Sequence, residues 1–165
     1  TGFIIFAGTT RPLEDVIYDQ FKYIFSLEGP ISETSKEKLH ELERQVARVK
    51  DAGLSPNTPS QELPLNIPAA YWLDVKGYRP QEVARGMTRP ILILQGGRDS
   101  QVTSEDFQGW KNALSSRKQV AFKLYPKLTH LFVESDRKST PAEYEIPGHV
   151  AAIVVEDIAT WVKQQ

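Results

Sequence analysis

The stretch ILILQGGRD, residues 91–99, begins with four consecutive apolar residues and ends in a polar turn that holds one carboxylate, Asp99. An apolar run of this kind is typical of a strand buried on both faces of a parallel sheet. In open α/β sheets, ligands bind beyond the carboxyl ends of the strands. We therefore expect Asp99 to lie at that edge of a sheet, with Gly96 and Gly97 allowing the backbone to turn sharply off the strand.

Similar patterns on both sides of this stretch predict an α/β fold. The apolar runs at residues 3–7 and 120–125 predict two further strands. Helices are predicted from about Leu13, Thr34, Ala69, Pro80, Thr103 and Val150. Strands that alternate with helices favour a parallel sheet with covered faces. Because three strands make a thin sheet with two unpaired edges, we expect this chain to be the carboxyl-terminal part of a longer protein.

For two of the predicted helices, the sequence also predicts how the helix starts or which side chains it buries. Thr34 and Glu37 have the spacing of a capping box at the start of the second helix. The last helix is expected to turn five apolar side chains inward, those of Ile153, Val154, Ile158, Trp161 and Val162.

Residues 11–75 separate the first two predicted strands and are too long for a plain crossover connection. They are therefore predicted to form a helical insertion above the sheet, and residues 1–10 and 76–165 to form the sheet-bearing core. Arg11 directly follows the first strand. It is a candidate for binding substrate at the carboxyl edge of the sheet, although it could equally be a surface cation.

The composition is that of an ordinary globular protein, with 40% hydrophobic residues, 10% aromatic residues and a formal net charge of −1. This balance disfavours a nucleic-acid partner, and the apolar runs are far shorter than a membrane span. Cysteine is absent, which excludes disulfides and thiolate metal sites. We expect neither a metal nor an organic cofactor, and the composition is compatible with more than one compartment.

A second candidate residue, His130, follows the strand predicted at residues 120–125 by five positions, much as Asp99 follows its own strand. If the two strands are neighbours, about 4.8 Å apart, both side chains begin at the same rim of the sheet. A carboxylate that holds one imidazole nitrogen leaves the other nitrogen free as a base and stabilises the imidazolium that forms. Asp99 and His130 are therefore predicted as a catalytic acid and base.

Less specific interpretations of these residues remain open. An aspartate after two glycines is often a turn or capping residue, and a lone histidine is often an ordinary loop residue. His130 and Glu134 have the spacing of a metal pair, but no third ligand is near them in the sequence. His40 is expected to be solvated, and His149 to cap or pack at the entrance to the last helix.

Five stretches carry a resemblance to a known family. They are FAGTTRPLEDVIYDQFKYI (6–24), RPILILQGGRDSQV (89–102), FKLYPKLTHLF (122–132), STPAEYEIPGHV (139–150) and HVAAIVVEDIATWVKQ (149–164). Together they resemble the carboxyl-terminal part of the α/β-hydrolases, most closely bacterial serine hydrolases of the esterase and serine-aminopeptidase-like type. The resemblance implies a partial α/β-hydrolase fold with a helical cap at residues 11–75. It also implies a Ser–Asp–His triad with Asp99 as the acid and His130 as the base.

The third member of such a triad is not found in this chain. The family carries its serine in G-x-S-x-G, on a tight turn from a strand to a helix, and the motif does not occur in these 165 residues. Residues 1–7 match the strand that follows the nucleophile's helix, so the serine is expected upstream of Thr1. Ser100 is rejected as the nucleophile, because its place beside Asp99 leaves no room for the imidazole.

The resemblance implies a serine hydrolase that cleaves an ester or amide through an acyl-enzyme, and the chain alone is expected to be inactive. The expected partners are a small-molecule ester or peptide substrate, and either the missing amino-terminal half or a second copy of the chain across the exposed sheet edge. Nucleic-acid and membrane partners are not expected. The alternative is a non-catalytic α/β binding or assembly module with a vestigial triad.

Overall fold

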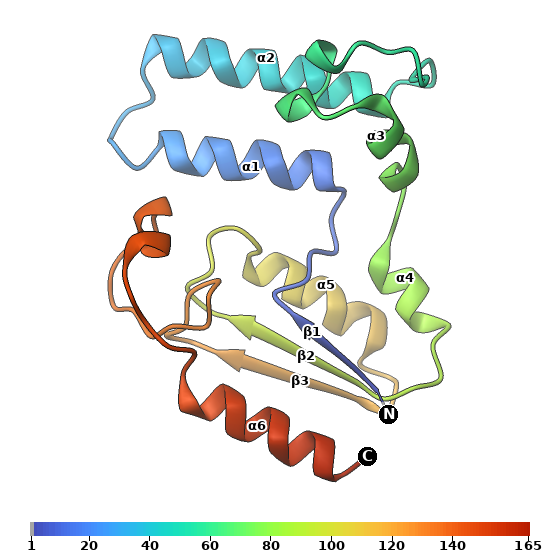
Figure 1. The fold of residues 1–165 in the computed structure, drawn as a ribbon, viewed down its shortest axis with the longest axis vertical. Coiled ribbons are helices and arrows are strands. Elements are labelled where there is room, and N and C mark those ends of the chain that lie inside the picture. Colours follow the sequence, from blue (N-terminus) through green and yellow to red (C-terminus); the bar gives the residue numbers. More distant parts are fainter. Residues whose placement is uncertain (1) are drawn as a thin grey trace. The chain divides into compact units, whose positions relative to one another are not determined.

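The computed structural model describes residues 2–165, and within them the chain forms a parallel sheet of three strands (Figure 1). The strands are β1 (Phe3–Phe6), β2 (Ile91–Gly96) and β3 (Val120–Tyr125), with β2 in the middle. Both neighbouring pairs run parallel. The predicted α/β class with a parallel sheet is thereby confirmed.

The chain divides into two compact units. The sheet unit comprises the residues up to Thr10 together with Arg79–Gln165, and the helical unit comprises Arg11–Tyr78. The insertion expected at residues 11–75 lies within the helical unit. Its role as a cap over a site stays a prediction.

β2 is buried on both of its faces, which explains its continuous apolar sequence. Leu92 and Leu94 belong to one apolar cluster, whereas Ile91 and Ile93 belong to another. All four residues are at most 1% exposed. Since burying one such side chain contributes about 1.5–3 kcal/mol, β2 is a major source of the stability of the sheet unit.

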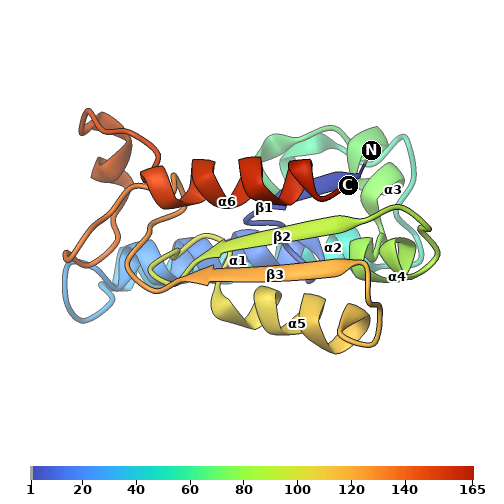
Figure 2. The same cartoon turned by 90° about the horizontal axis from the view of Figure 1, so that it is seen from below.

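Helices cover both faces of this sheet (Figure 2). α5 (Ser104–Leu114) packs on one face through residues such as Trp110, next to α4 (Pro80–Arg85). α6 (Ala152–Lys163) packs on the other face through Val154. The two apolar clusters therefore lie on opposite sides of β2, one under each helical layer.

The inward face of α6 is narrower than the sequence analysis predicts. Val154 is fully buried, and Ile158 and Trp161 are partly buried against the same cluster. Ile153 and Val162 are 51% and 54% exposed, so the prediction for these two residues is wrong. Neighbouring positions in a helix point about 100° apart, and the two side chains therefore leave the stripe that faces the sheet.

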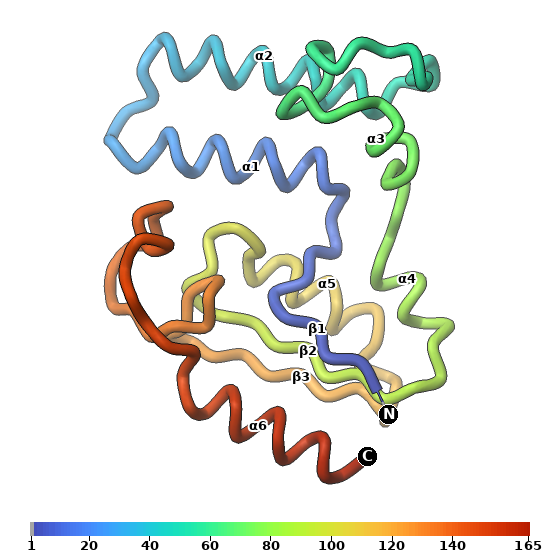
Figure 3. The backbone as a smooth tube through the Cα atoms, in the orientation of Figure 1, coloured from blue at the N-terminus to red at the C-terminus, as the bar shows by residue number. Residues whose placement is uncertain are grey.

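In the helical unit, α1 (Leu13–Phe25) and α2 (Glu33–Lys50) run side by side in opposite directions (Figures 1 and 3). Two short 3-10 helices, η1 (Ser60–Glu62) and η2 (Pro64–Asn66), precede α3 (Ala69–Val75). No helix in the described part of the chain combines the length and the apolar character needed to cross a membrane.

The start of α2 corrects the predicted capping box. Its N-cap is Ser32, whose side chain accepts a hydrogen bond from the Ser35 backbone N–H. Serine is as good a cap as threonine, so α2 starts before Thr34, which is itself helical. The apolar stripe of α2 is buried as the spacing predicts, at Leu39, Leu42, Val46 and Val49.

Candidate active site

The loops that follow β2 and β3 leave the sheet at the same edge and bind one another through their backbones (Figure 3). The Gly97 N–H donates to the Tyr125 carbonyl at 2.8 Å, and the Arg98 N–H donates to the Leu128 carbonyl at 2.9 Å. These bonds extend the contact between β2 and β3 beyond the ends of the strands. They hold the two candidate loops next to each other.

Gly96 and Gly97 are required by the close approach of the two loops. Neither glycine has a positive φ. A Cβ atom on Gly96 would lie 2.4 Å from the Thr129 carbonyl oxygen, and one on Gly97 would lie 2.8 Å from the Pro126 Cα. Any larger residue would therefore push the two loops apart. The chain turns at residues 97–98, and the close approach of the loops is a further reason for glycine at these positions.

The structure brings together the two side chains that the sequence analysis pairs. His130 Nδ1 lies 2.8 Å from Asp99 Oδ2. An ionised carboxylate only accepts hydrogen bonds, so Nδ1 carries the proton and Nε2 is the acceptor of the neutral ring. The Asp99 side chain is fully buried, whereas that of His130 is 29% exposed. The imidazole is thus fixed by a buried group and remains accessible.

Asp99 also organises its own turn. Its second oxygen, Oδ1, accepts hydrogen bonds from the backbone N–H groups of Gln101 and Val102 at 2.8 and 3.0 Å. Such side-chain contacts to the next residues are a common turn motif of aspartate. Asp99 is therefore a turn residue and the partner of the imidazole at the same time.

Gln95 is a further partner of Asp99 that the sequence patterns above do not single out. Its Nε2 lies 3.2 Å from Asp99 Oδ2 and 2.7 Å from the Val102 carbonyl oxygen. The residue is only 1% exposed. A signal for it exists in the sequence, because Gln95 is the one polar side chain that follows four apolar residues in a buried strand.

His130 lies in a tight turn that is anchored in the core. The Phe132 N–H donates to the Thr129 carbonyl at 3.0 Å, which closes the turn. Phe132 has a φ of 56° and is 4% exposed. Its ring packs edge-on against those of Phe6 and Tyr125, with centroids 5.4 and 6.2 Å away. The turn is therefore held against the sheet, which limits the motion of the imidazole.

Side chains of the Asp99 turn also hold the loop that follows His130. Three pairs of residues make these contacts: Arg98 Nη2 with the Arg137 carbonyl at 2.5 Å, Ser100 Oγ with Ser139 Oγ at 2.9 Å, and Gln101 Nε2 with Tyr144 OH at 2.6 Å. Contacts on both sides of Asp99 thus fasten the two loops to each other. This arrangement preserves the contact between Asp99 and His130.

The electrostatics of the pair favour a charged imidazole. The hydrogen bond to Asp99 raises the pKa of His130 above 6.5, although partial burial of the ring acts in the opposite direction. The charges of Asp99 and Glu143 raise this pKa further. Glu143 belongs to η3 (Pro141–Glu145), and it accepts a hydrogen bond from Ser139 at 3.2 Å. The site therefore stabilises the imidazolium that forms when His130 takes a proton.

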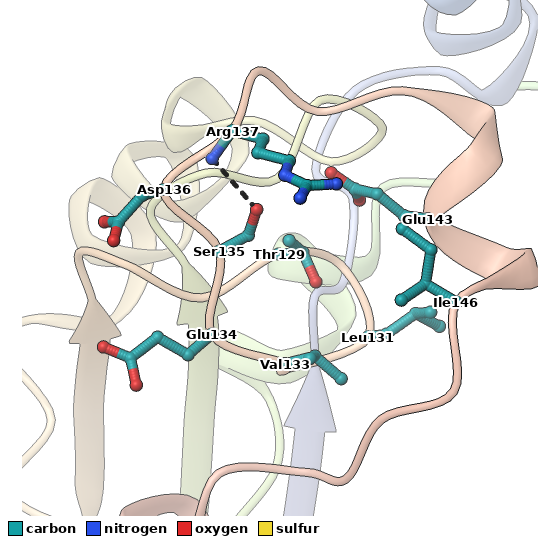
Figure 4. Close-up of a pocket in the computed structure, with 9 residues that line it drawn as sticks. All are labelled: Thr129, Leu131, Val133, Glu134, Ser135, Asp136, Arg137, Glu143 and Ile146. Atoms are coloured by element: carbon teal, nitrogen blue, oxygen red, sulfur yellow. Dashed lines mark hydrogen bonds between the residues drawn. The ribbon is translucent and has the colours of Figure 1, made fainter.

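A pocket of about 380 Å³ adjoins the turn that carries His130 (Figure 4). Its lining includes both chain neighbours of His130, Thr129 and Leu131, together with Glu143 and Ile146. The buried atoms Thr129 Oγ1 and Glu143 Oε1 have no hydrogen-bond partner among the described residues. The pocket offers space for a small organic group beside the turn that carries His130.

The remaining candidate residues lie elsewhere. Arg11 belongs to the helical unit and forms an ion pair with Asp19 of α1, with 2.5 Å between Nη1 and Oδ2. Its substrate-binding role stays a prediction. His40 and His149 are exposed. Among residues 2–165, there is no group of three or more His, Cys, Asp or Glu side chains that could hold a metal ion.

Comparison with known proteins places this site in a family. Residues 66–163, more than half of the chain, match the dienelactone hydrolase family. The chain belongs to this family. A curated relative, Esterase EstD of Thermotoga maritima, is 36% identical over 161 residues, which make up 98% of this chain and 37% of the relative. The chain therefore spans little more than a third of the length of the curated relative that it matches.

For this member of the dienelactone hydrolase family, the parallel sheet with its covering helices is part of an α/β-hydrolase fold. The predicted resemblance to α/β-hydrolases of the esterase type is confirmed at that level. The matched residues contain both Asp99 and His130. The catalytic roles of these two residues stay predictions.

Proposed function

We propose that this chain is the carboxyl-terminal part of a longer serine hydrolase that cleaves an ester or amide, with Asp99 and His130 as its catalytic acid and base. The observation that supports the proposal most strongly is the hydrogen bond of 2.8 Å between a fully buried carboxylate and a partly exposed imidazole. Membership of a hydrolase family and similarity to an esterase add independent support.

In the proposed reaction, His130 acts through Nε2. This nitrogen takes the proton of a serine hydroxyl as the serine oxygen attacks the carbonyl carbon of the substrate. Asp99 stabilises the imidazolium, which then gives the proton to the leaving alcohol or amine and leaves an acyl-enzyme. A water molecule releases the acid in the second half of the reaction, again with His130 as the base.

The serine of this mechanism would come from a segment outside this chain, because the chain holds no G-x-S-x-G motif. The exposed edge of β1 fits this proposal. Among the described residues β1 pairs with β2 alone, and Phe3 and Phe6 are 47% and 49% exposed. An amino-terminal half that adds a strand at this edge would cover both rings and remove an aggregation-prone edge.

The helical unit is proposed as a cap that selects the substrate. Arg11, which follows Thr10 of the sheet unit directly, is proposed to bind the substrate. The expected signature of such a residue is a raised KM with an unchanged kcat in an Arg11→Ala variant.

The test compares this 165-residue chain with the longer protein that the proposal requires, using a short-chain p-nitrophenyl ester. The chain alone should be inactive, and the longer protein should hydrolyse the ester and lose this activity when Asp99 or His130 is changed. Turnover by the chain alone that depends on either residue would contradict the missing nucleophile. A longer protein that lacks both G-x-S-x-G and activity would support the alternative of a binding module with a vestigial triad.

Light scattering of the same samples tests the exposed edge. The isolated chain should self-associate through the edge of β1, and the longer protein should not do so through this edge. A strictly monomeric isolated chain at high concentration would contradict the proposed need for a covering partner.

A further inference from the structure

Gln95 of β2 makes a contact that the proposed mechanism does not yet use, and its role rests on that proposed function. The Nε2 atom of its side chain is surrounded by three oxygens, at 3.1 Å from Gly96 O, 3.2 Å from Asp99 Oδ2 and 2.7 Å from Val102 O. All three oxygens are hydrogen-bond acceptors. The amide orientation is thereby determined, because a reversed amide would place an oxygen against three acceptors.

Gln95 holds Asp99 in two ways. Directly, its N–H group donates to Oδ2, the same oxygen that accepts from His130 Nδ1. Indirectly, it binds the carbonyl of Val102, whose own N–H donates to Asp99 Oδ1. The amide, the turn and the carboxylate therefore form a closed ring of hydrogen bonds on the inner side of Asp99.

These donors take the place of water around the Asp99 carboxylate, because its side chain is fully buried. Two backbone N–H groups serve Oδ1, whereas Oδ2 is shared between a neutral amide and the imidazole. Without the amide, the imidazole would be the one remaining donor to Oδ2 among these four groups. The carboxylate would then attract the imidazolium more strongly, because fewer dipoles offset its charge.

We propose that Gln95 is a positioning residue that acts through Asp99. Its buried amide takes up part of the negative charge of the carboxylate at Oδ2, the oxygen that binds His130 Nδ1. The imidazolium is then stabilised when His130 takes a proton, but less strongly than it would be beside a carboxylate that lacks the amide.

The test follows the side-chain NMR signals of His130 through a pH titration of the 165-residue chain. Removing the amide in Gln95→Met should raise the pKa of His130 by about one unit. Gln95→Glu, which has nearly the same shape and adds a carboxyl group, should raise this pKa further. Leu92→Met is the matched control, since it places the same side chain in the same buried strand away from Asp99, and it should leave the titration unchanged.

A purely structural role of Gln95 predicts a different result. Gln95→Met would then weaken folding but leave the pKa of His130 where Leu92→Met leaves it, or lower it, and either outcome overturns the proposal. If both Gln95 variants fail to fold, the pH titration of the unmodified chain is the test. The NMR signals of the Gln95 side-chain amide should then shift with pH at the same midpoint as those of His130. Amide signals that do not follow this midpoint would overturn the proposal.

Asp99→Asn distinguishes the Asp99–His130 pair from the role of Gln95. This variant should lower the pKa of His130, since the partner charge is lost. An unchanged pKa would contradict the Asp99–His130 pair and with it the proposed function. A lowered pKa in Asp99→Asn, combined with Gln95 variants that titrate like the Leu92→Met control, would overturn the role of Gln95 alone.

Discussion

Asp99 and Asp157 are two carboxylates of the sheet unit that each bind a side chain from β3 or its following loop, but their surroundings differ. Asp99 lies at the carboxyl edge of the sheet and is hydrogen-bonded to an imidazole and to neutral N–H groups. Asp157 lies on α6, over one face of the sheet, and accepts hydrogen bonds from Lys123 at 2.9 Å and from Tyr125 at 2.8 Å.

Asp157 and its partner Tyr125 keep the same protonation states over a wide pH range. The hydrogen bond from Lys123 lowers the pKa of Asp157 below 3.8, and the bond from Tyr125 adds to this, while burial acts in the opposite direction. Burial first, and then the contact with Asp157, raise the pKa of Tyr125 above its usual range. The hydrogen bond between these two residues therefore persists near neutral pH, and it attaches α6 to β3.

The Asp99 cluster changes its charge with one proton. The partner of its carboxylate is an imidazole whose pKa is raised above 6.5 by the hydrogen bond to Asp99, and the remaining donors of Asp99 are neutral. Whether a buried or half-buried carboxylate has a functional role is therefore indicated less by its burial than by the kind of group to which it is hydrogen-bonded. A lysine makes it a structural contact, and an accessible imidazole makes it a candidate for proton transfer.

The largest difference between the two carboxylates is expected in activity. In the longer enzyme of the proposal, Asp99→Asn should lower kcat by about 10²–10⁴-fold, because the imidazole loses its orientation and the charge that stabilises its protonated form. Asp157→Asn should leave kcat within about twofold of the unchanged enzyme. Steady-state hydrolysis of a p-nitrophenyl ester measures both values, and similar losses in the two variants would remove the distinction.

A Cβ atom at Gly96 should disturb the Asp99 cluster and spare the Asp157 cluster. Gly96→Ala places this atom 2.4 Å from the Thr129 carbonyl oxygen, so the loops must separate, at a cost of about 1–3 kcal/mol in the free energy of unfolding. Gly86→Ala is the control, because its nearest contact is 3.5 Å. Urea denaturation measures the loss, and NMR should show His130 uncoupled from Asp99; an unaffected pair would contradict the close approach of the loops.

Asp157→Asn should act on stability instead of activity. The loss of the Asp157 carboxylate weakens one hydrogen bond and one partly exposed ion pair. Together these contribute about 1 kcal/mol to the free energy of unfolding. Amide hydrogen exchange in α6 should become faster, while exchange in α5 stays unchanged. Asp74→Asn, at an exposed aspartate of the helical unit, is the matched control. Equal effects of the two substitutions would mean that Asp157 does not attach α6 to the sheet.

The smallest expected effect is on the pH dependence of the free energy of unfolding. The contributions of the two pairs should change in opposite directions with pH. The pKa of His130 is raised above 6.5, so its pair with Asp99 stabilises the fold below pH 6.5, and this contribution is lost as the pH rises through the raised pKa. The pKa of Asp157 is lowered below 3.8, so its contribution is present above pH 3.8 and is lost as the pH falls through the lowered pKa.

Urea denaturation of the unchanged chain, Asp99→Asn and Asp157→Asn between pH 3 and pH 9 measures both contributions. The difference in the free energy of unfolding between the unchanged chain and Asp99→Asn should become smaller at high pH. The corresponding difference for Asp157→Asn should become smaller at low pH. Two differences that change in the same direction would show that one of the pairs is assigned incorrectly.

Much of the fold follows from local patterns along the chain. The apolar run of β2 predicts a buried central strand, and the helical spacing of Leu39, Leu42, Val46 and Val49 predicts the buried stripe of α2. The predictions from sequence fail where two nearby residues are about equally suited to the same structural role. Ser32 and Thr34 are both good N-caps, and Ile153 differs from Val154 in position by a single helical step, so packing decides between them.

The sequence by itself determined the α/β class and the parallel sheet, and it placed Asp99 and His130 just beyond the ends of two strands, because apolar runs and helical periodicity alternate along the chain. The tertiary structure decided that these two strands are neighbours, which brings the two side chains together. Only the tertiary structure decided the roles of Gln95 and the two glycines. Their function depends on distances between loops that are far apart in the sequence, such as 2.4 Å from a Gly96 Cβ to the Thr129 carbonyl. Local propensities carry no information about such distances, which arise when separate segments pack together.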